Sequence, residues 1–227
     1  VAEMMNSLNA KALIVGRDLA SSEKALGDIP VVTSGHQVLP EKVIALKPDL
    51  VIIDASTGPK SAIDQIKSAG IRVEQTPESW NLDDISLKVQ AVADVIGAPQ
   101  QGGLLNQAMS SAITNSKLSS KPRIAFLYLR GTSSIYLIGG EGSGADSLVS
   151  AIGGIDVGAA VLPRPFNTMT AESLAMLNPD VIIVMTKGLE SVGGISGLLK
   201  LPGVAQTEAG KNQAVIDVDD SLLLSFG

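Results

Sequence analysis

The sequence predicts an α/β fold with two Rossmann-like lobes, mostly parallel sheets and a single long helix between the lobes. Short β-branched runs alternate with helical stretches along all 227 residues, which is typical of α/β construction. A helix–proline–strand unit occurs twice, and an amphipathic stretch lies between the two copies. We therefore expect a first lobe at residues 1–98, a linker helix at 99–118 and a second lobe at 119–227.

The first lobe opens in a helical pattern and continues with short aliphatic runs. Residues 50–53 read Leu-Val-Ile-Ile, an unbroken stretch that suits a parallel strand buried on both faces. Helices are expected at residues 41–46 and 61–69, and strands at residues 12–15, 31–33, 50–53 and 71–74.

Two helices are predicted where the first lobe ends. The first has apolar residues at helical spacing and closes at Gly97; the second starts after Pro99 and runs to about Lys117. At 1.5 Å per residue the second helix would be about 28 Å long. One helix packed on both lobes resists bending, so we expect little closure on ligand binding and similar scattering profiles with and without ligand.

The second lobe repeats part of the first. Residues 41–53 align with residues 172–184, which places Pro48 on Pro179, 131 positions later. In each copy a short helix ends before proline and a buried strand follows, as expected for two similar lobes that face each other across a cleft. Strands are expected at residues 124–129, 135–138, 181–185 and 214–218, and a helix at 147–152.

Composition excludes several classes of function. The net charge of −6 and the absence of a basic run argue against a nucleic-acid partner, which needs clustered Lys and Arg. Without cysteine there is no disulfide and no thiolate metal site. No apolar run reaches the roughly 18 residues that span a membrane. Both ends look trimmed, so we expect a fragment of a longer exported precursor.

His36 is the only histidine, and it is predicted to lie on a loop between a strand and a helix. In open α/β sheets this edge is where ligands bind. A surface histidine without a role explains the residue equally well. One histidine cannot build a histidine-rich zinc or manganese site, which needs three or four ligands.

Tyr128 and Arg130 lie two positions apart at the end of a predicted strand, so their side chains should share a face. A cation beside a phenol favours the phenolate, an anionic oxygen that suits ferric iron, and tyrosine is a known axial heme ligand. The alternative is a tyrosine with its hydroxyl in water beside a solvated arginine. Tyr136 is interpreted as a packing residue.

Motifs of nucleotide binding and of catalysis are missing. The glycine-rich segment at residues 139–146 lacks the lysine of a P-loop and has Ala145 where a dinucleotide fingerprint needs glycine. A tight turn is its commoner role. No G-x-S-x-G elbow occurs either. These absences weigh against an enzyme, although a Rossmann-like enzyme stays as an alternative.

The repeated helix-Pro-Asp-strand unit, the bridging helix and the segment Gly140-Glu141-Gly142-Ser143-Gly144-Ala145-Asp146 together resemble the hemin-binding proteins of ABC importers. These proteins belong to the helix-linked (class III) periplasmic-type binding proteins for siderophores, cobalamin and heme. The resemblance covers nearly the whole chain. It implies heme capture outside the cytoplasm and delivery to an ABC permease, with a ferric siderophore or cobalamin as the alternative ligand.

The resemblance also implies site residues. A Gram-positive branch pairs a first-lobe histidine with a second-lobe tyrosine that an arginine two positions on stabilises. By similarity, His36 and Tyr128 are axial ligands from opposite lobes, and Arg130 supports the phenolate. Arg164 is a candidate contact for the heme propionates. Apolar walls are expected from Leu162, Phe166 and Met169.

Docking to the permease dimer is implied as well. Relatives use one acidic residue on each lobe, and Glu190 lies near the expected place in the second lobe. The first-lobe equivalent falls near Pro59 and Lys60, where there is no acid, and Asp64 is a weak substitute. Relatives of the Gram-positive kind are lipoproteins on the outer face of the membrane, anchored through an upstream cysteine.

Overall fold

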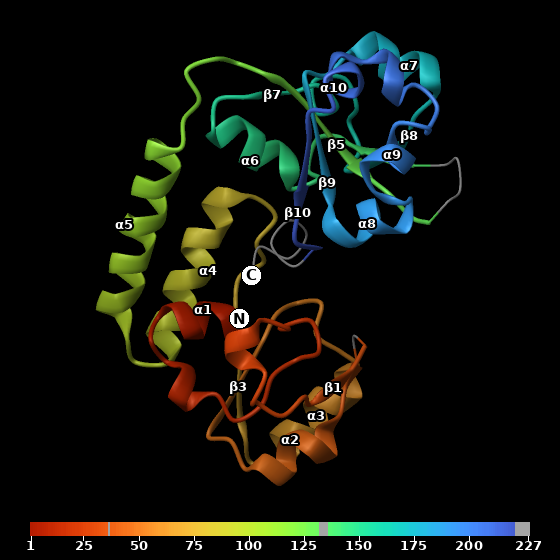
Figure 1. The fold of residues 1–227 in the computed structure, drawn as a ribbon. Coiled ribbons are helices and arrows are strands. Elements are labelled where there is room, and N and C mark those ends of the chain that lie inside the picture. Colours follow the sequence, from red (N-terminus) through yellow and green to blue (C-terminus); the bar gives the residue numbers. More distant parts are fainter. Residues whose placement is uncertain (36, 132–135, 221–227) are drawn as a thin grey trace. The chain divides into compact units, whose positions relative to one another are not determined.

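The computed structural model describes residues 1–35, 37–131 and 136–220, and the chain divides into two compact units (Figure 1). The first unit comprises Val1–Ser79 and Asp83–Ser110, and the second comprises Trp80–Leu82 and Ser111–Phe226. Each unit combines helices with strands, as predicted. Among the described residues, no helix is both long and apolar enough to cross a membrane.

The first unit contains a parallel strand pair with its crossover helix. Strand β3 (Leu50–Ile53) pairs in parallel with β4 (Arg72–Gln75), and α3 (Lys60–Ser68) connects them, since parallel strands require a crossover. Helix α2 (Pro40–Leu46) precedes β3 and starts with proline, whose fixed φ suits a first helical position. These four elements confirm the predicted ones to within one or two residues.

The strand predicted at residues 12–15 is wrong. Residues Lys11–Leu13 form a 3-10 turn (η1), and Leu13 is 61% exposed. An aliphatic run becomes a strand only where a neighbour completes its hydrogen bonds. In the described part of the chain, pairing near this run is limited to a single bridge between Arg17 and Val31.

The strand predicted at residues 31–33 is shifted and shortened. It appears as β1 (Thr33–Ser34), which pairs antiparallel with β2 (Gln37–Val38). The Val38 N–H donates to the Gly58 oxygen at 2.8 Å, so the loop that follows β3 supports this hairpin.

Helices α4 (Leu82–Val95) and α5 (Pro99–Asn115) form a hairpin, in agreement with the two predicted amphipathic helices. Gly102 of α5 lies against α4, where an added Cβ would lie 2.6 Å from the Ala93 Cβ. Val89 and Val92 of α4 also form a core with Met4 of α1 (Ala2–Ser7). A second 3-10 turn, η2, spans Lys24–Leu26.

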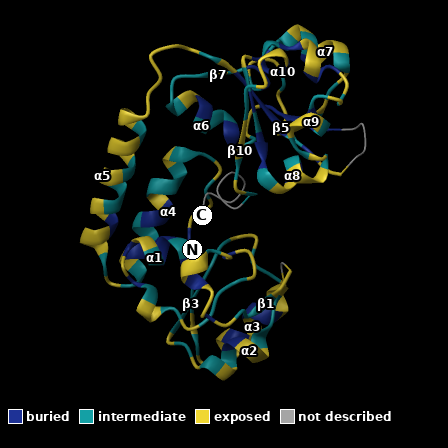
Figure 2. Ribbon diagram, viewed as in Figure 1, coloured by how far each residue is buried: buried dark blue, intermediate teal, exposed yellow. Residues whose placement is uncertain are grey.

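The second unit is built on one mixed sheet. Its strand order is β10-β9-β5-β6-β8, and β7 pairs with the start of β5. The pairs β10–β9, β9–β5 and β5–β7 are parallel, whereas β5–β6 and β6–β8 are antiparallel. Figure 2 shows buried residues in this sheet, where Phe126 and Ile182 are completely buried. The strands are β5 (Arg123–Tyr128), β6 (Leu137–Gly139), β7 (Ile155–Asp156), β8 (Phe166–Thr168), β9 (Val181–Met185) and β10 (Val215–Val218).

The helices of the second unit are short and lie between these strands in the sequence. A 3-10 turn, η3, precedes the last helix. The helices are α6 (Ala145–Ala151), α7 (Ala171–Leu177), α8 (Thr186–Ser191), α9 (Gly194–Leu198) and α10 (Glu208–Lys211), and the 3-10 turn is η3 (Val204–Gln206).

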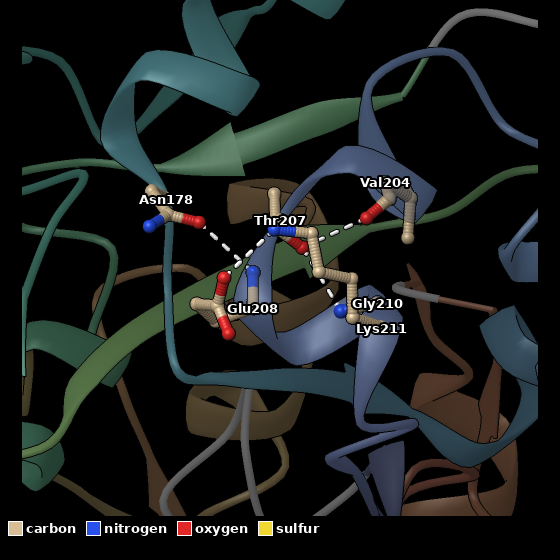
Figure 3. A network of polar contacts seen from close by, with 6 residues as sticks. All are labelled: Asn178, Val204, Thr207, Glu208, Gly210 and Lys211. Carbon is tan, nitrogen blue, oxygen red and sulfur yellow. Dashed lines mark hydrogen bonds and ion pairs between the residues drawn. The ribbon is translucent and has the colours of Figure 1, made fainter.

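The predicted repeat is confirmed in the backbone. Helix α2 followed by β3 corresponds to α7 followed by β9, and the residues before the two prolines, Lys47 and Asn178, both have left-handed backbones with φ of 49° and 40°. The second copy has an addition that Figure 3 shows: the Asn178 Oδ1 accepts from the Glu208 N–H at 2.9 Å. The Thr207 Oγ1 caps α10 by accepting from the Gly210 N–H at 3.0 Å.

Candidate functional site

Tyr128 is the last residue of β5, at the carboxyl end of a buried parallel strand. Two nitrogens of Arg130 donate to its phenolic oxygen: Nη2 at 2.9 Å and Nε at 3.2 Å. The guanidinium carbon lies 5.1 Å from the centre of the phenol ring. Both donors belong to one charged guanidinium, and hydrogen bonds from a charged donor are stronger than those from a neutral one. The two side chains are thereby held together at the end of β5.

Phe166, the first residue of β8, lies beside the phenol. The ring centroids of Tyr128 and Phe166 are 5.5 Å apart with an interplanar angle of 59°. Phe166 also meets the buried Phe126 edge-on, with centroids 6.2 Å apart. Aromatic pairs of this kind contribute about 0.5–1.5 kcal/mol beyond burial. Phe166 is itself 36% exposed, so one part of it packs and another part stays accessible.

The chain that leaves Arg130 is fixed by α8. The Gly131 N–H donates to the Ser191 Oγ at 3.0 Å, and that hydroxyl donates to the Gly188 oxygen at 2.7 Å. The same helix carries Glu190, which is exposed. The segment with Tyr128 and Arg130 is therefore tied to the neighbouring helix.

Arg164 is exposed on the loop that leads into Phe166. The structure thus brings Tyr128, Arg130 and Phe166 into contact and places Arg164 two positions before the last of these. Two of the expected apolar wall residues, Leu162 and Met169, pack partly buried against the core cluster of the second unit. The third, Phe166, contacts the tyrosine ring.

His36 lies outside the described residues. The expected strand before it and the expected helix after it are present as β1 and α2, and the short strand β2, which was not predicted, lies between His36 and α2. The strands on its two sides pair with Ser34 opposite Gln37.

The loop that supports this hairpin is organised by Asp54. Its carboxylate accepts from the hydroxyls of Ser56 at 2.8 Å and of Thr57 at 2.9 Å. Burial works against ionisation of Asp54, but these hydrogen bonds and the charge of Lys88 outweigh it and lower the pKa of the carboxyl.

Asp146 has a role in the glycine-rich turn that its sequence pattern was not used to predict. Its carboxylate accepts from the N–H groups of Gly142 at 2.8 Å and Gly144 at 3.0 Å, and so it closes the glycine-rich turn before α6. An aspartate two positions after a glycine run and in the first turn of a helix is a recognisable signal for such a turn.

The chain is similar to heme-binding proteins of known structure. HmuT, a heme binding protein with a crystal structure, is 37% identical, with a TM-score of 0.79 over 100% of this chain and 76% of that chain. Solved variants of HmuT replace a histidine, a tyrosine and an arginine with alanine, and the last two are two positions apart. The periplasmic heme-binding protein RhuT from Roseiflexus sp. RS-1, in its apo form, is 33% identical, with a TM-score of 0.87 over 100% of this chain and 88% of that one.

A curated relative is the uncharacterized ABC transporter substrate-binding lipoprotein YvrC of Bacillus subtilis (strain 168). It is 27% identical over 195 residues, which cover 82% of this chain. The chain spans 60% of the length of that relative.

A model of the periplasmic binding protein family matches residues 1–222, which takes in nearly all of the sequence and both units. Members of this family bind substrates outside the cytoplasm rather than convert them. The α/β units, the helix α5 and the mixed sheet agree with that architecture. The chain belongs to the periplasmic binding protein family.

Proposed function

We propose that this chain captures heme and delivers it to the permease of an ABC importer. The observation that carries the proposal is the pair of hydrogen bonds from Arg130 to the Tyr128 oxygen at the end of β5. Tyrosine is an established axial ligand of heme iron, and the Arg130 guanidinium donates to the oxygen that would bind the iron. The spacing of these two residues equals that of the tyrosine and arginine altered in HmuT.

We assign the second axial position to His36. A neutral imidazole is a good ligand for heme iron, and His36 is the only histidine of the chain. The flanking strands β1 and β2 are hydrogen-bonded to each other, and Val38 of β2 also donates to the loop at Gly58.

Arg164 is proposed to bind a heme propionate. Its place on the loop before Phe166 puts it in the same unit as Tyr128, and an exposed guanidinium matches a carboxylate in geometry and charge. The heme face would contact Phe166, whose ring is partly exposed beside the phenol.

Delivery is proposed to use Glu190 as a contact for the permease dimer, because this carboxylate is exposed on α8. Asp64, the weak first-unit substitute, forms an ion pair with Lys60 at 2.7 Å. We further propose an extracytoplasmic protein held at the membrane by a lipid anchor, in line with the lipoprotein YvrC. The protein would bind and release heme without catalysing a reaction on it.

A hemin titration followed by absorbance tests the heme proposal. The protein should give a Soret band and visible bands of a six-coordinate ferric heme. Tyr128→Ala and His36→Ala should each change the spectrum, and the double variant should lose specific uptake. Arg72→Ala, which alters only an exposed ion pair with Glu74, is the control. A spectrum identical to that of free hemin would refute heme binding, and saturable binding of cobalamin or a ferric siderophore would then support the alternative ligand.

A further inference from the structure

The glycine-rich loop at residues 140–144 has no free backbone donors. The N–H groups of Gly142 and Gly144 donate to Asp146, and that of Ser143 donates to the Gly140 oxygen at 3.1 Å. The remaining two, of Gly140 and Glu141, donate to carbonyls of the loop at residues 162–165. All five consecutive donors are thus engaged within the chain, and none is directed to a ligand.

The hydrogen bonds donated by Gly140 and Glu141 end at residues on either side of Arg164 in the sequence. The Gly140 N–H donates to the Pro165 oxygen at 3.0 Å, and the Glu141 N–H donates to the Leu162 oxygen at 3.0 Å. The Arg164 oxygen accepts from the Asn167 Nδ2 at 2.7 Å. The backbone is therefore fixed just before, at and just after this arginine.

Gly140 is the residue that permits this approach. A Cβ at this position would overlap the Arg164 oxygen and would lie 2.6 Å from the Leu162 oxygen. These neighbours are backbone atoms, so they could yield only by moving the loop. The neighbouring residue Gly139, in β6, pairs with Phe166 of β8, and Phe166 packs on Tyr128.

From this geometry we infer that Gly140 is a positioning residue for Arg164: the glycine-rich loop presents this guanidinium to a carboxylate of the ligand bound at Tyr128. The inference rests on the proposed function, in which Arg164 binds a propionate, and adds that the packing of Gly140 holds the backbone of this arginine in place. The loop acts through its close packing against residues 162–165 and binds no anion itself.

The test compares hemin with hemin dimethyl ester, in which both propionates are blocked. Arg164→Ala should weaken hemin binding about tenfold or more, as expected for one charge-assisted hydrogen bond. Gly140→Ala should weaken it similarly, and the double variant should be no weaker than Arg164→Ala alone. With the dimethyl ester, all three should bind like the unchanged protein.

Two further variants make the result decisive. Asn167→Ala removes the donor to the Arg164 oxygen without adding a Cβ to the loop, so it should reproduce the pattern even if Gly140→Ala folds poorly. Gly103→Ala, in α5 with nothing within 4 Å, is the matched control and should bind both probes normally.

Unchanged hemin affinity in Gly140→Ala and Asn167→Ala, or an equal loss for hemin and its ester, would overturn the inference while leaving heme binding intact. Failure of the unchanged protein to bind either probe would instead refute the proposed function.

Discussion

The two tyrosines of the chain lie in opposite surroundings. The Tyr136 hydroxyl donates to the Pro202 oxygen at 2.6 Å, and the residue is only 4% exposed. Burial raises the pKa of Tyr136 to about 12, so this side chain is fixed as a neutral donor. Tyr128, in contrast, accepts two hydrogen bonds from Arg130. The same side chain is therefore a buried donor at one position and an acceptor from a charged group at the other.

Tyr136→Phe should lower the free energy of unfolding by about 1 kcal/mol at pH 8, because it removes one hydrogen bond and leaves a carbonyl without its partner. The folded pKa of about 12 lies above the ordinary value of 10. The contribution of Tyr136 is therefore complete below pH 10 and declines by about 1.4 kcal/mol per pH unit up to the folded pKa. Urea unfolding of the unchanged protein and of Tyr136→Phe at pH 8 and pH 11 measures this. A difference in their free energies of unfolding that is no smaller at pH 11 than at pH 8 would contradict it.

Arg130→Lys should weaken hemin binding about tenfold, and Arg130→Ala should weaken it more. Lysine keeps the charge but cannot reproduce the donation from Nη2 and Nε to one oxygen, which depends on the planar guanidinium. Hydrogen bonds to charged groups contribute about 1.5–3 kcal/mol, which sets the scale of the alanine effect. The measurement is a competition titration with hemin, and equal affinities of the lysine and alanine variants would argue against the two-donor contact.

At the scale of elements, the two copies of the helix–proline–strand unit differ in what stabilises their left-handed residue. Lys47 is exposed and has φ of 49°, a conformation that is unfavourable for a residue with a Cβ. Asn178 has φ of 40°, but its side chain accepts the Glu208 N–H and so connects α7 to α10 (Figure 3). Asparagine also tolerates this backbone region better than lysine does.

The same substitution should therefore have opposite effects at the two positions. Lys47→Gly should raise the free energy of unfolding by about 1 kcal/mol, because glycine adopts this backbone without strain. Asn178→Gly should lower it by about 1 kcal/mol, since it removes the acceptor of a helix-terminal N–H. Chemical unfolding of the two variants side by side measures both effects, and stabilisation of both would mean that the Asn178 hydrogen bond contributes nothing.

Regular elements with long patterns were predictable, and short ones were not. The unit at residues 171–185 follows from its apolar spacing and its proline. Strands β7 and β8 were missed because they have two and three residues and include Asp156 and Asn167, which have low strand propensity. The error at residues 12–15 arose because an aliphatic run does not reveal whether a strand will pair with it.

The candidate site was predictable to the extent that it depends on local spacing. Tyr128 and Arg130 are two positions apart, so a shared face follows from strand geometry. The contact of Phe166 with Tyr128 joins segments 38 positions apart and depends on the register of β6 with β8. Likewise, the packing of Gly140 against Arg164 depends on how two loops meet, which no local pattern specifies.

At the scale of the whole molecule, charge constrains how heme could be captured. The chain carries a net charge of −6, so its long-range field repels a ligand with two carboxylates. Electrostatic attraction must then come from local cations, and the exposed Arg130 and Arg164 lie just after β5 and just before β8. Screening by salt should weaken the repulsion and leave short-range hydrogen bonds largely intact.

Hemin should protect both units of the chain from amide hydrogen exchange if His36 and Tyr128 bind the same iron. A ligand at one hundred times its dissociation constant stabilises the folded state by about 2.7 kcal/mol. Exchange should therefore slow in the segment at residues 123–131 and also in the hairpin of β1 and β2. In Tyr128→Ala protection should fall in both segments, and in His36→Ala the hairpin should lose it first. Protection confined to residues 123–131 in the unchanged protein would mean that Tyr128 binds heme without His36.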